Sequence, residues 1–273
     1  MPERARVAQL LTQTWTIAAL RERFVVRGEP LPRAVEKELA SDSRAGARAV
    51  LTVVRERRRR ARAEQRRLRK LLSYERARWD EGHALVAGLD EVGMGPMAGP
   101  VVASAVVLPP SARIVGIDDS KRLDASTRER LAVEIREVAL GVGVGWVPSE
   151  EIDRVGLHAA GLLAMRRAMD DLGVTPTAAL VDGQRPPELG VPVTTIVKGD
   201  RLSMSIAAAS IVAKVLRDAH MVKMDGLLPG YGFARHKGYI TAVHKRGLAT
   251  LGPSRIHRRC FAIVREADAL TGR

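Results

Sequence analysis

The sequence predicts a mixed α/β fold, a β-sheet with helices on both faces, joined to a helical N-terminal extension. Two observations support this prediction: valine-rich runs of strand length alternate with longer runs of helical periodicity, and the charge changes near residue 80. Residues 1–80 hold 21 Lys and Arg against 10 Asp and Glu, whereas residues 81–273 hold 24 against 21. We therefore expect a basic helical extension, residues 1–80, and a nearly balanced body, residues 81–273.

The extension is expected to be helical and to contact a polyanion. Residues 4–24 and 31–40 have the pattern of short helices, and residues 45–79 that of one long helix. The middle of that helix, residues 55–70, holds ten basic and two acidic side chains. Such a run can bind the phosphate backbone of a nucleic acid, although it can also be a solvated helix face whose charge aids solubility.

In the body, strands predominate early and then alternate with helices, which predicts a mixed sheet covered on both faces. The expected strands are 85–91, 101–108, 142–147, 178–182 and 191–198. The expected helices are 126–140, 156–172, 203–224, 238–248 and 257–269. We expect the last of these helices to form a C-terminal helical segment.

Composition narrows the class of protein further. The net charge is +14 and the pI is near 10.8, which favours a polyanionic partner. With 46% apolar residues the chain can form a packed core, and none of its apolar runs is long enough to span a bilayer. The single cysteine, Cys260, rules out an intrachain disulfide, and no hydrophobic signal segment opens the chain. We expect a cytoplasmic protein with no membrane partner.

Four carboxylates follow apolar runs in the body, at three separate places. Asp90 and Glu91 end LVAGLDE, Asp182 ends AALVD, and Asp200 follows TIVKG. An apolar strand that ends on an acid exposes that acid at the rim of the sheet, where carboxylates repel one another unless a cation lies between them. Four oxygen ligands without a Cys or His cluster suit Mg²⁺ or Mn²⁺ rather than zinc.

Each of these places also has a plainer interpretation. The run VGMGPMAGP after Glu91 can be an ordinary β-turn, and Asp200 can simply cap the helix expected from residue 203. Neighbouring residues in a regular strand point to opposite faces. Asp90 and Glu91 therefore reach one site only if the strand end bends, which Gly93 and Gly95 permit.

Six blocks of the body resemble, in order, the signature blocks of bacterial ribonuclease HII. They are GLDEVGMGPMAGPVVASAVVL, DDSKRL, LVDGQ, KGDRLSMSIAAASIVAKVLRD, YGFARHKGY and HRRCF. The extension loosely resembles the helical extension of longer members. The resemblance implies an RNase H-like fold and a type 2 ribonuclease H, a metal-dependent endonuclease. Its expected partners are RNA/DNA hybrids, whose RNA strand it hydrolyses, and duplex DNA with single embedded ribonucleotides, which it incises on their 5′ side.

The resemblance assigns the metal site. Its four metal-binding, catalytic carboxylates fall on Asp90, Glu91, Asp182 and Asp200. Two Mn²⁺ or Mg²⁺ ions about 4 Å apart would stabilise the attacking and leaving oxygens and yield 3′-hydroxyl and 5′-phosphate ends. Asp218, another acid in a family block, is expected to be structural or to lie just outside the ligands of the metal. The six histidines form no convincing triad with any serine.

The resemblance also implies substrate contacts. Gly93, Met94 and Gly95 form the turn whose backbone reads the 2′-hydroxyl, and the ring of Tyr239 would pack on the sugar beside the scissile phosphate. Lys121 is a candidate phosphate contact. Alternatively, Tyr239 is a half-buried core ring and Lys121 a solvated surface residue. We expect the protein to act as a monomer.

Two positions depart from the family pattern. Met94 stands where the family's turn usually has Arg, and the lost charge-assisted hydrogen bond to phosphate typically costs about 1.5–3 kcal/mol. Cys260 replaces a common serine, and we expect its side chain to be buried. Two rivals remain at this point: ribonuclease HIII, which shares the chemistry, and a degenerate nucleic-acid binder, which Met94 alone supports.

Overall fold

The computed structural model describes residues 15–271, so part of the helix expected at 4–24 lies outside the described residues. The chain divides into two compact units, Met1–Arg67 and Leu68–Arg273. The division falls inside the long helix α4 (Ala45–Leu71).

The first unit is a small helical assembly with its own core. It contains α2 (Ile17–Arg21), a π-helical turn (Glu22–Val26), α3 (Arg33–Ser41) and the first part of α4. Its core combines apolar residues of all these helices: Leu20, Phe24, Leu31, Val35, Leu39, Ala47, Val50, Leu51 and Val54. Residues 55–67 of α4, which hold most of its arginines, belong to no such cluster.

The second unit opens with a helix break. The helix expected at 45–79 is interrupted at Leu72, whose φ of −89° and ψ of 12° leave the helical region, and continues as α5 (Ser73–Asp80). The break lets the buried side chain of Glu75, in α5, contact the first residues of a later helix. Glu75 Oε1 accepts hydrogen bonds from Ser203 Oγ at 2.6 Å and from the backbone N–H of Ser205 at 2.9 Å.

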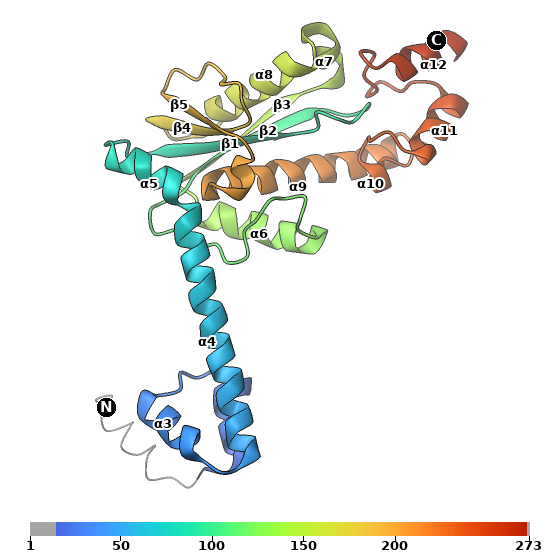
Figure 1. The fold of residues 1–273 in the computed structure, drawn as a ribbon. Helices are drawn as coiled ribbons and strands as arrows, with labels where there is room; N and C mark the ends of the chain where they lie inside the picture. The colour runs from blue at the N-terminus through green and yellow to red at the C-terminus, as the bar shows by residue number, and fades with distance from the viewer. Residues whose placement is uncertain (1–14, 272–273) are drawn as a thin grey trace. The chain divides into compact units, whose positions relative to one another are not determined.

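A five-stranded sheet in the order β3–β2–β1–β4–β5 is the centre of the second unit (Figure 1). The strands β1, β2 and β3 form an antiparallel meander, and β4 and β5 add in parallel to β1. Their bounds are β1 (Val86–Val92), β2 (Val101–Val107), β3 (Gly141–Val147), β4 (Ala178–Asp182) and β5 (Val193–Ile196). The mixed sheet predicted from the valine-rich runs is confirmed.

Helices cover both faces of this sheet, as predicted. One face carries α7 (Ser149–Val155) and α8 (Leu157–Asp170), and the other carries α9 (Met204–Leu227) and α6 (Ala125–Val138) (Figure 1). Alternation along β1 supplies both cores: Ala87 and Leu89 join the cluster under α8, whereas Val86 packs against Ile206 of α9. The helix expected at 156–172 is preceded by α7 and separated from it by Gly156, whose φ is 85°.

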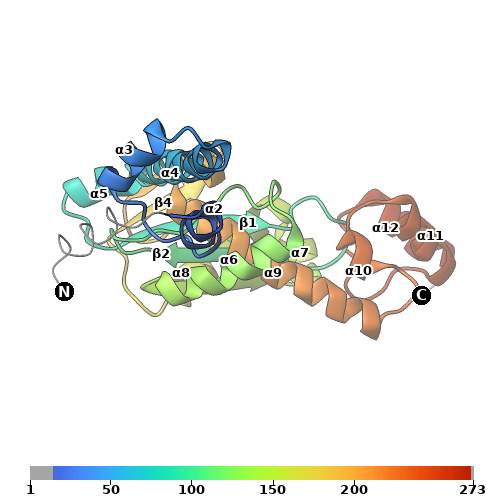
Figure 2. The same cartoon turned by 90° about the horizontal axis from the view of Figure 1, so that it is seen from below.

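Three short helices gather at the C-terminal end of α9, as Figures 1 and 2 show. They are α10 (Phe233–His236), α11 (Ala242–Leu251) and α12 (Ala262–Thr271). The helix expected from residue 238 starts later because Lys237 and Gly238 both have positive φ, and Thr241 caps α11 instead. Within residues 15–271, the model has no helix that is both long and apolar enough to cross a membrane.

Candidate active site

Three of the predicted carboxylates meet at one edge of the sheet because β1 and β4 are parallel neighbours. Their register pairs Leu89 with Val181, so the next residues along the two strands are Asp90 and Asp182. Glu91 follows Asp90 within β1. The carboxyl ends of these strands thus bring together side chains from positions 90 and 182 of the chain.

Asp90 lies on the α9 face of the sheet, where the helix packs very closely. A Cβ on Gly88 would lie 2.2 Å from the carbonyl carbon of Ser205 in α9, so only glycine fits there. Asp90 is 6% exposed, and its Oδ1 accepts a hydrogen bond from the backbone N–H of Glu91 at 2.8 Å. Burial, and then the charges of Glu91 and Asp182, raise the pKa of Asp90 well above its usual range.

Glu91 points to the opposite face, toward α8. A Cβ on Gly161 of α8 would lie 4.0 Å from Glu91 Cγ and 3.3 Å from Met94 Sδ. Glu91 and Asp182 line one small cavity of about 120 Å³ with both of these residues. Burial and the charge of Asp182 raise the pKa of Glu91. The two neighbouring acids therefore approach Asp182 from different faces of the sheet.

Asp200 completes the group from a 3₁₀ turn, Gly199–Arg201, between β5 and α9. The side chain that caps α9 is Ser203, which accepts from the backbone N–H of Ile206. The capping alternative for Asp200 is therefore wrong. Burial, then the charges of Asp119 and Asp182, raise the pKa of Asp200 to about 6.

Asp119 is an acid of this neighbourhood to which the sequence analysis gave no role. It is 1% exposed and forms an ion pair with Arg201 at 2.8 Å. Burial acts to raise the pKa of Asp119, but the backbone N–H of Lys121 and the Arg201 guanidinium lower it overall. The sequence signal for Asp119 is the motif DDSKRL, in which two acids precede a lysine. Lys121 itself is exposed, and its charge opposes the raised pKa values of Glu91 and Asp200.

The glycine-rich turn after β1 rests on a buried arginine that sequence reasoning missed. Gly93 has a φ of 97°, and a Cβ there would lie 2.5 Å from Arg217 Nε. Arg217 is fully buried and donates to the carbonyls of Pro100 at 2.9 Å, Ala98 at 3.2 Å and Lys237 at 3.0 Å. A single side chain of α9 thereby connects the turn with the segment that precedes Tyr239.

Tyr239 lies beside the turn with its ring exposed. Its residue is 42% exposed, and a Cβ on Gly95 would lie 3.4 Å from its Cε1. The core-ring alternative is therefore wrong.

Two buried histidines hold the backbone of Tyr239 through a chain of hydrogen bonds. His244 Nδ1 is 2.9 Å from the carbonyl oxygen of Tyr239, and its Nε2 is 3.0 Å from His257 Nε2. His257 Nδ1 accepts from the backbone N–H of Ser254 at 2.9 Å. These contacts assign neutral rings, in which His257 donates to His244 and His244 donates to Tyr239. Burial lowers the pKa of His244 to about 4 and that of His257 to about 3.

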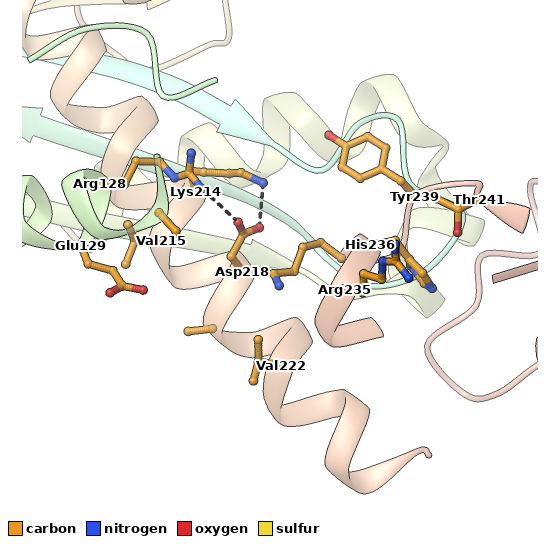
Figure 3. Close-up of a pocket in the computed structure, with 13 residues that line it drawn as sticks. Arg128, Glu129, Lys214, Val215, Asp218, Val222, Arg235, His236, Tyr239 and Thr241 are labelled. Carbon is orange, nitrogen blue, oxygen red and sulfur yellow. Dashed lines mark hydrogen bonds and ion pairs between the residues drawn. The ribbon is translucent and has the colours of Figure 1, made fainter. Parts of the chain in front are cut away.

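A larger pocket of about 680 Å³ extends from Tyr239 along α9 to the start of α6 (Figure 3). Asp218 lies in it and forms an ion pair with Lys214 at 2.8 Å and a longer one with Arg128 at 3.9 Å. Its carboxylate is thus held by two cations, which agrees with the expected structural role. The other basic residues of the pocket are Arg235 and Lys237.

Cys260 is exposed, so the expectation that it is buried is wrong. The fold holds the backbone of Cys260, because its N–H donates to Asp153 Oδ1 at 2.8 Å. The turn before α12 therefore turns the thiol outward.

The four carboxylates are candidate ligands of a metal ion. Within the described part of the chain, no group of three or more acidic, histidine or cysteine side chains is arranged to hold an ion. The donor chemistry nevertheless suits a hard cation: Asp90, Glu91 and Asp200 all have raised pKa values to which a neighbouring carboxylate contributes. Mg²⁺ typically takes one or two carboxylates and completes its shell with water and substrate phosphate. The residues fit such ions.

Family models match nearly the whole described chain. The model described as Ribonuclease HII matches residues 87–264, and the one described as Ribonuclease HII N-terminal domain matches residues 16–79. The chain is 52% identical to Ribonuclease HII of Anaeromyxobacter sp. (strain Fw109-5) over 255 residues, which cover 93% of this chain and 81% of that protein. It is 50% identical to Ribonuclease HII of Myxococcus xanthus (strain DK1622), with coverage of 93% and 87%.

Solved structures share the fold. The ribonuclease H2 of Pyrococcus horikoshii OT3 superposes with a TM-score of 0.60 at 25% identity, covering 69% of this chain and 99% of that one. A ribonuclease HIII solved with Mn²⁺ superposes with a TM-score of 0.54 at 21% identity, covering 69% and 70%. The family matches and the fold together define an enzyme of the ribonuclease H class. The chain belongs to the ribonuclease HII family, whose members are endoribonucleases acting on RNA/DNA hybrids. The ribonuclease HIII alternative is thereby set aside.

Proposed function

We propose that this ribonuclease also incises duplex DNA on the 5′ side of a single embedded ribonucleotide, using divalent ions held by Asp90, Glu91, Asp182 and Asp200. The observation that carries the proposal is the electrostatic coupling of these acids, since each raised pKa among them has a neighbouring carboxylate as a cause. When bound, Mg²⁺ or Mn²⁺ would supply charge stabilisation at the attacking and leaving oxygens of the phosphodiester.

The turn and Tyr239 are proposed to recognise the ribonucleotide. Gly93 and Gly95 let the backbone approach a sugar closely, and the exposed Tyr239 ring lies beside Gly95, in reach of the same sugar. A backbone N–H or carbonyl can hydrogen-bond a 2′-hydroxyl, which DNA lacks. Lys121, whose charge acts on Glu91 and Asp200, is proposed to contact a phosphate close to the carboxylates.

The C-terminal helices are proposed to hold the duplex beyond the cleavage point. The pocket of about 680 Å³ continues from Tyr239 and carries Arg128, Lys214, Arg235 and Lys237, which suit phosphate oxygens. We also propose that the protein acts as a monomer, so one chain would supply the whole site.

The test is cleavage of duplex DNA that holds one ribonucleotide, with Mg²⁺ or Mn²⁺. We expect a cut 5′ to the ribonucleotide that leaves a 3′-hydroxyl and a 5′-phosphate. Asp90→Asn keeps the shape of the side chain and removes its charge, and we expect it to lower the rate by about 100-fold or more. Cleavage of continuous hybrids without cleavage at single ribonucleotides would overturn the proposal.

A further inference from the structure

The first unit has a pocket of its own that is lined almost wholly by arginine. The pocket measures about 330 Å³ and lies between α3 and α4. One carboxylate, Glu36, stands among its lining residues. The others are Arg33, Arg55, Arg58, Arg59, Arg62 and Arg66.

Helix geometry gathers four of these arginines on one face of α4, which we call the arginine face. Arg55, Arg59, Arg62 and Arg66 follow one another at spacings of four, three and four residues, which keeps them on one side of an α-helix. They extend over about 16 Å of helix, at about 1.5 Å per residue.

Of the two acids in the same helical segment, Glu64 lies on the other side of the helix, and Glu56 lies at the flank of the arginine face. Glu56 and Glu64 are turned from Arg62 by about 120° and 160° around the axis. Glu56 pairs with Arg60 as well as with Arg59, and Glu64 pairs with Arg67. The charges of that opposite side are thus largely matched within the helix itself.

The arginine face is not balanced in this way. Of its members, Arg55 pairs with Glu36 at 2.8 Å and Arg59 pairs with Glu56 at 2.8 Å, and Glu36 also accepts from the adjoining Arg58 at 2.5 Å. Arg62 and Arg66 are exposed, and neither side chain forms a hydrogen bond or ion pair with any residue among 15–271. Like charges at i and i+4 destabilise a helix, so folding of this unit gains nothing from the pair.

We propose that the arginine face binds the phosphate backbone of the duplex that this enzyme cuts. The identity of the occupant rests on the proposed function, whereas the site rests on the charges of α4. A duplex carries one negative charge per about 1.7 Å of its axis, so several phosphates lie within the length of the face. Guanidinium groups bind phosphate in a bidentate manner, and no aromatic side chain lines the pocket, so the contact is independent of base sequence.

The contact adds affinity rather than catalysis. A second contact within one chain makes the encounter with the active site intramolecular and raises the effective concentration of substrate there. Removing the face therefore weakens binding and reduces its salt dependence, and leaves the position of the cut unchanged.

The experiment compares two double variants of the full chain, each in an Asp90→Asn background that binds without cutting. Arg62→Gln with Arg66→Gln removes two charges from the arginine face. Arg60→Gln with Arg67→Gln removes two charges from the opposite side of the same helix. Binding to a ribonucleotide-containing duplex is followed by fluorescence anisotropy between about 50 and 200 mM salt.

We expect the first double variant to bind roughly tenfold more weakly at low salt and to lose nearly two from the slope of log K against log salt, about 0.9 per phosphate contact. The control should keep the parental slope. Equal slopes in all three proteins, or equal losses in both double variants, would overturn the proposal and leave an acidic protein as the remaining kind of partner.

Cleavage assays keep this result separate from the proposed function. With Asp90 intact, the first double variant should cut at the parental position and at the parental rate when substrate saturates the enzyme. If the variants show the expected difference in slope but the parent does not incise at single ribonucleotides, the proposed function alone is refuted.

Discussion

Asp182 Oδ1 accepts a hydrogen bond from the backbone N–H of Gly199 at 2.6 Å. The contact connects the end of β4 with the turn that carries Asp200, and so holds two of the four acids in one neighbourhood. It uses one oxygen of Asp182 and leaves the other for a cation. Asp182 is thus both a structural acceptor and a candidate ligand.

Asp182→Asn separates these two roles, because the amide oxygen can keep the bond to Gly199 while the charge is lost. We expect cleavage to fall by about 100-fold or more with little change in the free energy of unfolding. Asp182→Ala should lose activity and also about 1–2 kcal/mol of stability, since the Gly199 N–H loses its partner. Activity assays and urea denaturation test this, and an Asn variant that cuts at the parental rate would contradict the assignment.

Arg217 is predicted to be a positioning residue for the substrate turn. Arg217→Lys keeps a charge but cannot donate to three carbonyls at once, so the turn and the segment before Tyr239 lose their shared support. We expect a loss of about 2–3 kcal/mol in stability and a fall in kcat/KM at temperatures where the variant is folded. Arg166→Lys, an exposed change on α8, is the control. If Arg217→Lys behaved like this control, the positioning role would be refuted.

The variant Met94→Arg tests how much activity the enzyme loses by having methionine in its substrate turn. The sulfur of Met94 lies against Gly161 on the α8 side of the sheet. An arginine at this position can add a charge-assisted bond to substrate phosphate, so Met94→Arg should raise kcat/KM by about tenfold. Met94→Leu, which keeps the apolar contact, should stay near the parent. Steady-state cleavage of a ribonucleotide-containing duplex measures both, and a slower or unchanged Arg variant would show that the turn does not depend on this charge.

The hydrogen-bonded pair His244 and His257 predicts that the stability of the fold falls at acid pH. His244 is neutral when folded, with its pKa lowered to about 4 from 6.5, so between these values the unfolded chain binds a proton that the folded chain does not. Stability is therefore complete above about pH 6.5 and is lost as the pH falls toward 4. His244 alone accounts for about 2 kcal/mol between about pH 7 and pH 5.

Unfolding at several pH values tests this prediction. His244→Leu is expected to be less stable than the parent near neutral pH but to vary less over the same interval. Carboxylates common to both proteins cancel in the comparison. Parallel pH profiles for parent and variant would show that His244 does not titrate on unfolding.

Much of the fold could be read from local pattern. Valine-rich runs predicted the strands, and the apolar centre of α9 predicted a helix buried on most faces, because side-chain burial follows the periodicity of each element. Element ends were less predictable. The break at Leu72 depends on where Glu75 meets Ser203 and Ser205, a contact across 128 or more residues that no local signal encodes.

By itself, the sequence determined the class of fold and pointed to the four acids as candidate ligands, since Asp90 and Asp182 each follow an apolar run that ends at the rim of the sheet. Only the tertiary structure decided that Ser203 rather than Asp200 caps α9, and that Cys260 is exposed. It also revealed Arg217, whose bonds to Ala98 and Pro100 join segments 119 and 117 residues apart. Such contacts depend on how distant elements pack, and packing is a property of the whole chain rather than of any one segment of it.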